Sequence, residues 1–202
     1  MAGKKTVKSF PLWFKLVYTF FFSIIMYVNL FHYGWRNLLW FSHIALLLLF
    51  VGIWSGKRLF VSMAGISVLV FHSLWTTSFF AQLLFGLELG GVSYMFDSGT
   101  PLFLRSVSLF HVFTPPLITI ILSKTGYERK AFRYQKFWGA FVIIITYILS
   151  PEKNINWVHG PVNPQNFLNP ALYLLILIAG VITFVYYPTH IVLDKKFGDK
   201  LS

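Results

Sequence analysis

The sequence predicts an all-α, polytopic membrane protein with six transmembrane helices and with both termini in the cytoplasm. Six long apolar runs divide the chain, and 56% of its 202 residues are hydrophobic whereas only 11% are charged. A soluble domain of this size has about a quarter of its residues charged. Two of the runs, 59–86 and 170–193, are long enough to cross a hydrocarbon core of about 30 Å as helices.

The distribution of positive charge predicts the orientation. All Lys and Arg residues except Arg36, Arg105 and Lys153 lie before the first run, after the last run or in alternate gaps between runs. Because short cytoplasmic loops keep Lys and Arg, we expect these gaps on the inner side. Six spans use most of the chain, so residues 1–202 are expected to form one transmembrane helical domain. We interpret the basic start of the chain as the flank of a retained span rather than as a signal peptide.

The first three spans follow from where the apolar residues begin and end. A helix is expected to start near Pro11, and its uninterrupted apolar part covers 16–30. The second span is predicted at 37–54 and ends inside at the basic turn 56–58. The third is predicted at 59–85 and runs outward, and its second half is polar.

The last three spans are predicted in the same way. The fourth covers 101–123, begins with a proline suited to a first helical turn, and should be kinked by Pro115 and Pro116. The fifth covers about 137–150, with a start that falls a little earlier among aromatic residues. The sixth covers 170–193 and returns to the inner side.

Charge and cysteine content exclude several classes of function. The net charge of +11 comes from basic residues in short loops beside apolar helices, where anionic lipid attracts them. We therefore expect membrane lipid as a partner and no nucleic acid. The chain has no Cys, which excludes disulfides, a thiolate nucleophile and Cys-ligated metal. We predict no cofactor.

Five ionisable residues are predicted at similar depth in the outer half of the membrane. His43 is expected about two turns below the outer end of its span, His72 near the midpoint of its own, and His111 about 15 Å down the fourth span. Arg105 is expected one turn below the outer end, with Asp97 just above it. Ionisable groups in a bilayer generally face the bundle interior and pair there. We therefore expect one cavity that opens to the outer half.

These groups are of the types that nucleophilic catalysis uses. A hydroxyl from Ser42 or Thr76 needs a base to take its proton, and His72 or His111 can serve. The carboxylate can orient the base, and the guanidinium can stabilise an oxyanion or hold a lipid headgroup. The structural alternative is that each group only satisfies a neighbouring helix or reaches the headgroups.

The loop 154–161 is a second polar feature. Asn156 and Trp157 lie within a short stretch that also contains another amide and an imidazole. Such groups can recognise a headgroup through hydrogen bonds, or they can satisfy the backbone of their own loop. Both interpretations stay open from the sequence.

A metal site is the competing chemistry. Three histidines and a carboxylate can bind zinc and activate water. However, no two of the span histidines are three or four residues apart on one helix, so the ligands would have to come from three helices. We predict no metal.

Two short segments carry a resemblance to a known family. Residues 40–44 read Trp-Phe-Ser-His-Ile, and residues 110–116 read Phe-His-Val-Phe-Thr-Pro-Pro. They resemble the androgen-induced, six-span fatty-acid-ester hydrolases (membrane threonine hydrolases), which have a catalytic Thr early in the second span and a catalytic His in the fourth. The resemblance implies Ser42, in place of Thr, as nucleophile, His111 as second catalytic residue, and a lipid ester as substrate. The rest of the chain resembles a bacterial membrane protein, which implies the cytoplasmic (inner) membrane.

The sequence therefore predicts a membrane-embedded hydrolase that acts on a lipid ester at a polar site in the outer half of the bilayer. The predicted catalytic residues are Ser42, His111 and His72. The predicted substrate-binding residues are His43, Thr76, Asp97, Arg105, Asn156 and Trp157. Two alternatives remain: a non-enzymatic lipid or small-molecule binding or transport protein, and a structural subunit of a membrane complex. The chain is open to self-association or to a membrane partner protein.

Overall fold

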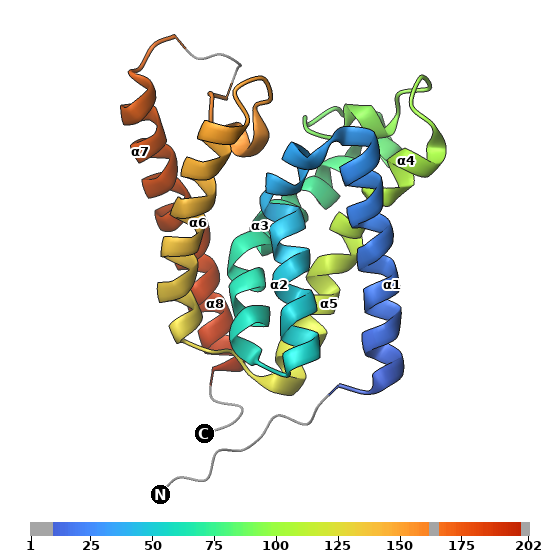
Figure 1. Cartoon of the computed structure of the whole chain (residues 1–202), viewed down its shortest axis with the longest axis vertical. Helices are drawn as coiled ribbons and strands as arrows, with labels where there is room; N and C mark the ends of the chain where they lie inside the picture. Colours follow the sequence, from blue (N-terminus) through green and yellow to red (C-terminus); the bar gives the residue numbers. More distant parts are fainter. Residues whose placement is uncertain (1–9, 162–165, 199–202) are drawn as a thin grey trace, which may run out of the picture.

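A computed structural model describes residues 10–161 and 166–198, and every regular element in these ranges is helical (Figure 1). Four helical segments are long and apolar enough to cross a membrane, namely Leu12–Tyr33, Arg58–Phe85, Leu102–Thr125 and Pro170–Phe197. The predicted all-α class is confirmed, and an integral membrane location is supported by these four helices. We call the two ends of the bundle upper and lower, as they stand in Figure 1.

The first helical segment runs upward and then turns. Helix α1 (Leu12–Val28) follows Pro11 and continues into a π-helical turn, Asn29–Tyr33. Gly34, at φ +84°, ends that turn in a conformation that favours glycine, and a 3₁₀ turn (Trp35–Leu39) follows. Helix α2 (Phe41–Ser55) therefore begins four residues later than the predicted span.

Helix α3 (Arg58–Phe85) is the centre of the bundle and packs against α2, α5, α6 and α8. Half of the most apolar part of α3 is buried inside the protein, whereas only 11% of the corresponding part of the segment Pro170–Phe197 is buried. Helix α3 is therefore surrounded mainly by other helices, and the last segment faces mainly outward. The turn into α3 uses Gly56 at φ +68°. Beside this turn, a Cβ added to Gly52 would lie 2.7 Å from Cγ2 of Val61, so only glycine lets α2 approach α3 here.

The fourth segment is broken into α4 (Leu102–Val107) and α5 (Phe110–Thr125). The break between the two helices lies at Ser108, above Pro115 and Pro116, the two residues at which we expected a kink. Both prolines are inside α5, so the helix continues through them and the break falls nearer its upper end.

A hydrogen bond from α3 compensates for one of these prolines. Pro115 has no N–H to donate to the carbonyl of His111, four residues earlier in α5. The hydroxyl of Thr76 donates to that carbonyl instead, at 3.4 Å. Hydroxyl side chains of neighbouring helices commonly replace backbone donors lost to proline in membrane helices.

The last two segments form a helical hairpin against α3. Helix α6 (Lys130–Leu149) starts seven residues before the predicted fifth span, because basic residues interrupt the apolar and aromatic ones in its first two turns. Helix α7 (Pro170–Gly180) leads through a π-helical turn (Val181–Tyr186) into α8 (Tyr187–Phe197). The last turn of α8 and the first turn of α1 lie at the same, lower end of the bundle (Figure 1).

The lower end is held by two ion pairs from consecutive residues. Glu128 accepts from Arg58 at the start of α3, at 3.1 Å. Arg129 pairs with Asp194 near the end of α8, at 2.7 Å. The turn between α5 and α6 therefore connects the central helix to the last one. Next to it, the hydroxyl of the buried Tyr127 lies 2.7 Å from Nδ1 of His190.

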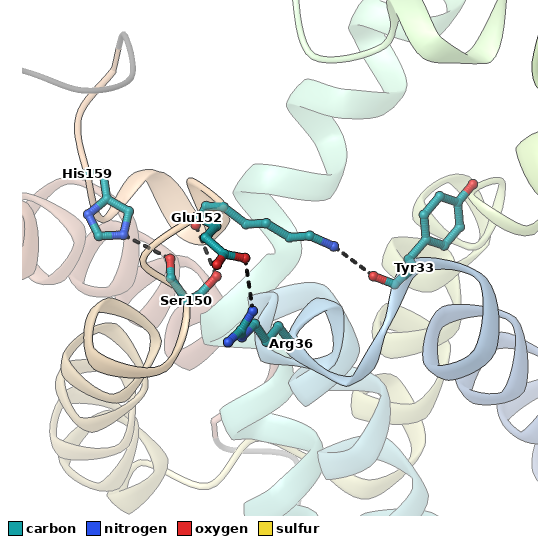
Figure 2. A network of polar contacts seen from close by, with 6 residues as sticks. Tyr33, Arg36, Ser150, Glu152 and His159 are labelled. Carbon is teal, nitrogen blue, oxygen red and sulfur yellow. Dashed lines mark hydrogen bonds and ion pairs between the residues drawn. The ribbon is translucent and has the colours of Figure 1, made fainter.

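The upper end is held by a network that joins the first third of the chain to the last (Figure 2). Arg36 pairs with Glu152 at 3.2 Å, and Nζ of Lys153 donates to the carbonyl of Tyr33 at 2.7 Å. We call these two contacts the upper clamp. They fix the turn between α1 and α2 to the loop that follows α6.

Candidate functional site

A cavity of about 1110 Å³ lies at the upper end, between α2, α3, α5 and the two upper loops. Its walls include aromatic and aliphatic side chains such as Phe71, Trp75 and Leu104. No Asp, Glu, Lys or Arg is among the described residues that line it. Of the residues predicted from the sequence, the lining includes Ser42, His43, His72, His111, Asn156 and Trp157.

Three imidazoles from three helices surround one phenylalanine in this cavity. The ring centroids of His72 and His111 are 4.5 Å apart. The ring of Phe110 lies 4.0 Å from that of His111, 5.8 Å from that of His72 and 5.7 Å from that of His43. The predicted convergence of the three histidines is therefore present, with an aromatic ring among them.

In two of these rings, a hydrogen bond to a backbone carbonyl determines which nitrogen carries the hydrogen. Nδ1 of His43 lies 2.9 Å from the carbonyl oxygen of Asn37, and Nδ1 of His111 lies 2.8 Å from that of Ser108. Since a carbonyl only accepts, each Nδ1 carries the hydrogen and donates it. In the neutral imidazole the other nitrogen, Nε2, is then an acceptor. The break in the fourth segment is what leaves the Ser108 carbonyl facing His111.

Three of the four remaining ring nitrogens are buried and have no partner within residues 10–161 and 166–198. His72 is 1% exposed, and neither of its ring nitrogens makes a hydrogen bond there. Nε2 of the buried His43 is likewise without a partner. Buried polar atoms are nearly always hydrogen-bonded, so these atoms need a partner such as a ligand or water.

Ser42 lines the same cavity from the first turn of α2. In the described part of the chain its hydroxyl makes no hydrogen bond to a histidine. Catalytic hydrogen bonds are often long in an empty site and tighten when substrate binds. The structure therefore brings Ser42 and His111 to one cavity without joining them.

Asn156 and Trp157 form part of the upper wall, and the amide has a clear structural role. Both residues have positive φ angles, +54° and +57°. Oδ1 of Asn156 accepts the backbone N–H of Phe41 at 3.0 Å, and Nδ2 donates to the carbonyl of Leu39 at 2.9 Å. The amide thus caps the start of α2 from a distant loop, and its hydrogen bonds are used there rather than in the cavity. The indole of Trp157 packs edge-on against Trp40.

Three predicted site residues do not line the cavity. Thr76 is engaged with the His111 carbonyl, as described above. Arg105 donates from Nη1 to the carbonyl of Met95 at 2.9 Å and so holds the loop above α4. Asp97 accepts from the backbone N–H of Gly99 and from the hydroxyl of Thr100, each at 2.9 Å. These two hydrogen bonds hold the pKa of the Asp97 carboxyl below its ordinary value.

Sequence reasoning missed a polar chain at the rim. Nε1 of Trp40 donates to Oδ1 of Asn37, Asn37 donates in turn to Oδ1 of Asn29, and Asn29 donates to the carbonyl of Ile25 at 2.8 Å. The signal was present, because Asn29 is an amide inside an apolar run. These three hydrogen bonds engage the amides of Asn29 and Asn37, whereas buried ring nitrogens of His43 and His72 have no partner among the described residues.

A metal centre is not formed by the cavity histidines. Throughout the described ranges, no three His, Asp or Glu side chains come together in a way that could hold a metal ion. Comparison with known proteins gives no further assignment, since no protein-family model, curated protein or solved structure matches the chain.

Proposed function

We propose that this protein is a membrane-embedded hydrolase that acts on a lipid ester in the upper cavity. The observation that carries the proposal is that Ser42, His72 and His111 reach one large, largely apolar cavity from three helices. Such a cavity can hold an acyl chain beside a few convergent polar groups. Ser42 and His111 are also the nucleophile and the second catalytic residue that the resemblance to the six-span hydrolases implies.

Each residue has a distinct role in this mechanism. Nε2 of His111 takes the proton of the Ser42 hydroxyl while Oγ attacks the ester carbonyl. The single N–H of His72 donates to the developing oxyanion. His111 then returns the proton to the leaving alcohol, and water hydrolyses the acyl-enzyme by the same route. Arg105, which donates to the Met95 carbonyl, has no role in this scheme.

Labelling with a fluorophosphonate tests the proposal. We expect the purified wild-type protein to be labelled, Ser42→Ala to be unlabelled and His111→Asn to be labelled at least a hundredfold more slowly. Ser78→Ala is the matched control, because Ser78 lines the same cavity from α3, and it should be labelled like the wild type. Equal labelling of Ser42→Ala and wild type, or no labelling of either, would contradict the serine mechanism.

Binding without turnover is the second candidate, and one observation favours it. The Ser42 hydroxyl makes no hydrogen bond to the His43, His72 or His111 rings of the described chain, and no carboxylate lines the cavity to assist a base. A lipid retained at one copy per protein in native mass spectrometry, with no hydrolysed product over hours, would support binding or transport over hydrolysis.

We further propose six membrane crossings with both ends of the chain inside, in a bacterial inner membrane. The shared position of the first turn of α1 and the last turn of α8 supports an even number of crossings (Figure 1). Because the chain has no Cys, single-cysteine variants give a clean test. An impermeant maleimide should label Glu88→Cys in intact cells and Lys195→Cys only after permeabilisation, and the reverse pattern would overturn the orientation.

A further inference from the structure

The three histidines of the upper cavity offer more hydrogen-bond acceptors than donors, and this imbalance bears on which headgroup they bind. Three neutral imidazoles have six ring nitrogens and three N–H groups. Two of the N–H groups already donate to the carbonyls of Asn37 and Ser108. The buried nitrogens that remain are one acceptor on His43 and one donor and one acceptor on His72. His111 keeps one acceptor, because its N–H is the one that donates to Ser108.

The surroundings favour the neutral imidazoles. No carboxylate lines the described cavity to stabilise an imidazolium, and the His72 and His111 rings are in contact, so two positive charges would repel each other. The described lining also lacks Lys and Arg, which usually bind carboxylate or phosphate groups. An anionic headgroup would bring only acceptors to three imidazoles that have three acceptor nitrogens and one N–H left to bind it.

From this balance we propose that the cavity selects a neutral headgroup that donates hydrogen bonds through hydroxyl groups, such as the glycerol of a monoacylglycerol, over a carboxylate or a phosphate. This deepens the proposed function by naming its substrate class, and rests on it only in taking the cavity as the substrate site. Hydroxyls donate to His43 and His72, while Nε2 of His111 stays available as base. The acyl chain lies along the apolar walls.

Ligands that cannot be hydrolysed separate recognition from chemistry. The probe is 1-O-oleylglycerol, a diol with an ether in place of the ester. Its matched control is the 2,3-di-O-methyl derivative, which keeps the oxygens and the chain but donates no hydrogen bond. Oleate and phosphatidate supply the two anions. Binding is measured in detergent by native mass spectrometry and by the fluorescence of the cavity residues Trp75 and Trp157.

The expected result is that wild-type protein binds the diol at least tenfold more tightly than the dimethyl ether or either anion, because an unmatched buried acceptor is costly. His43→Phe should bring the diol-to-ether ratio towards one. Leu89→Ala, which shortens an apolar side chain of the cavity wall, should weaken the binding of the diol and of the dimethyl ether equally and leave the ratio of their affinities unchanged. Equal binding of diol and dimethyl ether, or tighter binding of an anion, would overturn the inference, whether or not His43→Phe folds.

The outcome is separable from that of the hydrolase proposal. A diol preference without fluorophosphonate labelling of Ser42 would support this inference and remove the hydrolase. Labelling of Ser42 without a preference for the diol would support the hydrolase and overturn this inference. Preference of 1-O-oleylglycerol over free glycerol distinguishes a lipid headgroup from a soluble polyol as the source of the hydroxyls.

Discussion

Oδ1 of Asn156 accepts the backbone N–H of Phe41 at 3.0 Å, although 115 residues separate them along the chain. An N-terminal cap usually comes from the residue directly before the helix, but Trp40 has no side chain that can accept this hydrogen bond. The loop after α6 therefore orders the first turn of α2, which carries Ser42 and His43. Any activity that depends on these two residues should depend on this loop.

Removing the Asn156 amide should destabilise the protein by about 1–2 kcal/mol, the usual range for a lost cap and a buried hydrogen bond. Asn156→Gly is the informative variant, because glycine accepts the φ of +54° and the loss is then due to the side chain. Asn156→Asp keeps an acceptor for Phe41 but loses the donor to Leu39. Thermal unfolding in detergent should rank wild type above Asp and Asp above Gly; a Gly variant as stable as wild type would contradict the capping role.

Thr76→Val should cost about 0.5–1 kcal/mol, because the carbonyl of His111 then has no donor to replace the N–H absent at Pro115. Pro115→Ala restores that N–H, so the cost of Thr76→Val should shrink in the Pro115→Ala background. A double-mutant cycle by thermal unfolding measures this coupling. Strictly additive effects would show that the two residues act independently.

Of the two lower ion pairs, the one between Arg58 and Glu128 should stabilise the folded protein more, although its atoms are 3.1 Å apart and those of the other pair are 2.7 Å apart. Its side chains are 31% and 26% exposed, whereas Arg129 in the other pair is 64% exposed and better screened by water. We expect Glu128→Gln to cost up to about 1 kcal/mol and Asp194→Asn less. Thermal unfolding of both variants at low and high salt checks which substitution costs more stability. A larger cost for Asp194→Asn would show that solvent exposure does not determine the strength of these ion pairs.

Alkaline pH should destabilise the protein partly through Tyr127. Burial raises the pKa of the Tyr127 hydroxyl above its ordinary value of 10. A group whose pKa is raised by folding contributes stability below its unfolded pKa and loses it as the pH rises further. Tyr127→Phe should therefore lose less stability than wild type between pH 9 and pH 11 in a series of melting curves. Parallel curves would exclude this residue as a source of the pH dependence.

The elements marked by apolar runs were predictable, and those set by tertiary contacts were not. The start of α3 at Arg58 lies one residue from the prediction, because the basic turn before it interrupts the apolar pattern. The break at Ser108 could not be predicted, because no Pro or Gly in 106–110 interrupts the apolar run there. In the same way, α2 begins late because a distant amide caps it at Phe41.

The depth of a residue along its predicted span identified the histidines of the candidate site correctly, but it did not do so for the predicted charged residues. His43, His72 and His111 meet because ionisable groups avoid lipid and their depths match. Arg105 and Asp97 were predicted at a similar depth, yet Arg105 donates to the carbonyl of Met95 and Asp97 accepts from the N–H of Gly99, both of which are backbone groups nearby in the sequence. Local hydrogen bonds of this kind leave no periodic mark in a sequence.

The upper clamp has a consequence for the order in which the protein can mature. Tyr33 and Arg36 are synthesised long before Glu152 and Lys153, the residues that hold them. The turn between α1 and α2 can therefore reach its final position only after α6 and the loop that follows it have been synthesised.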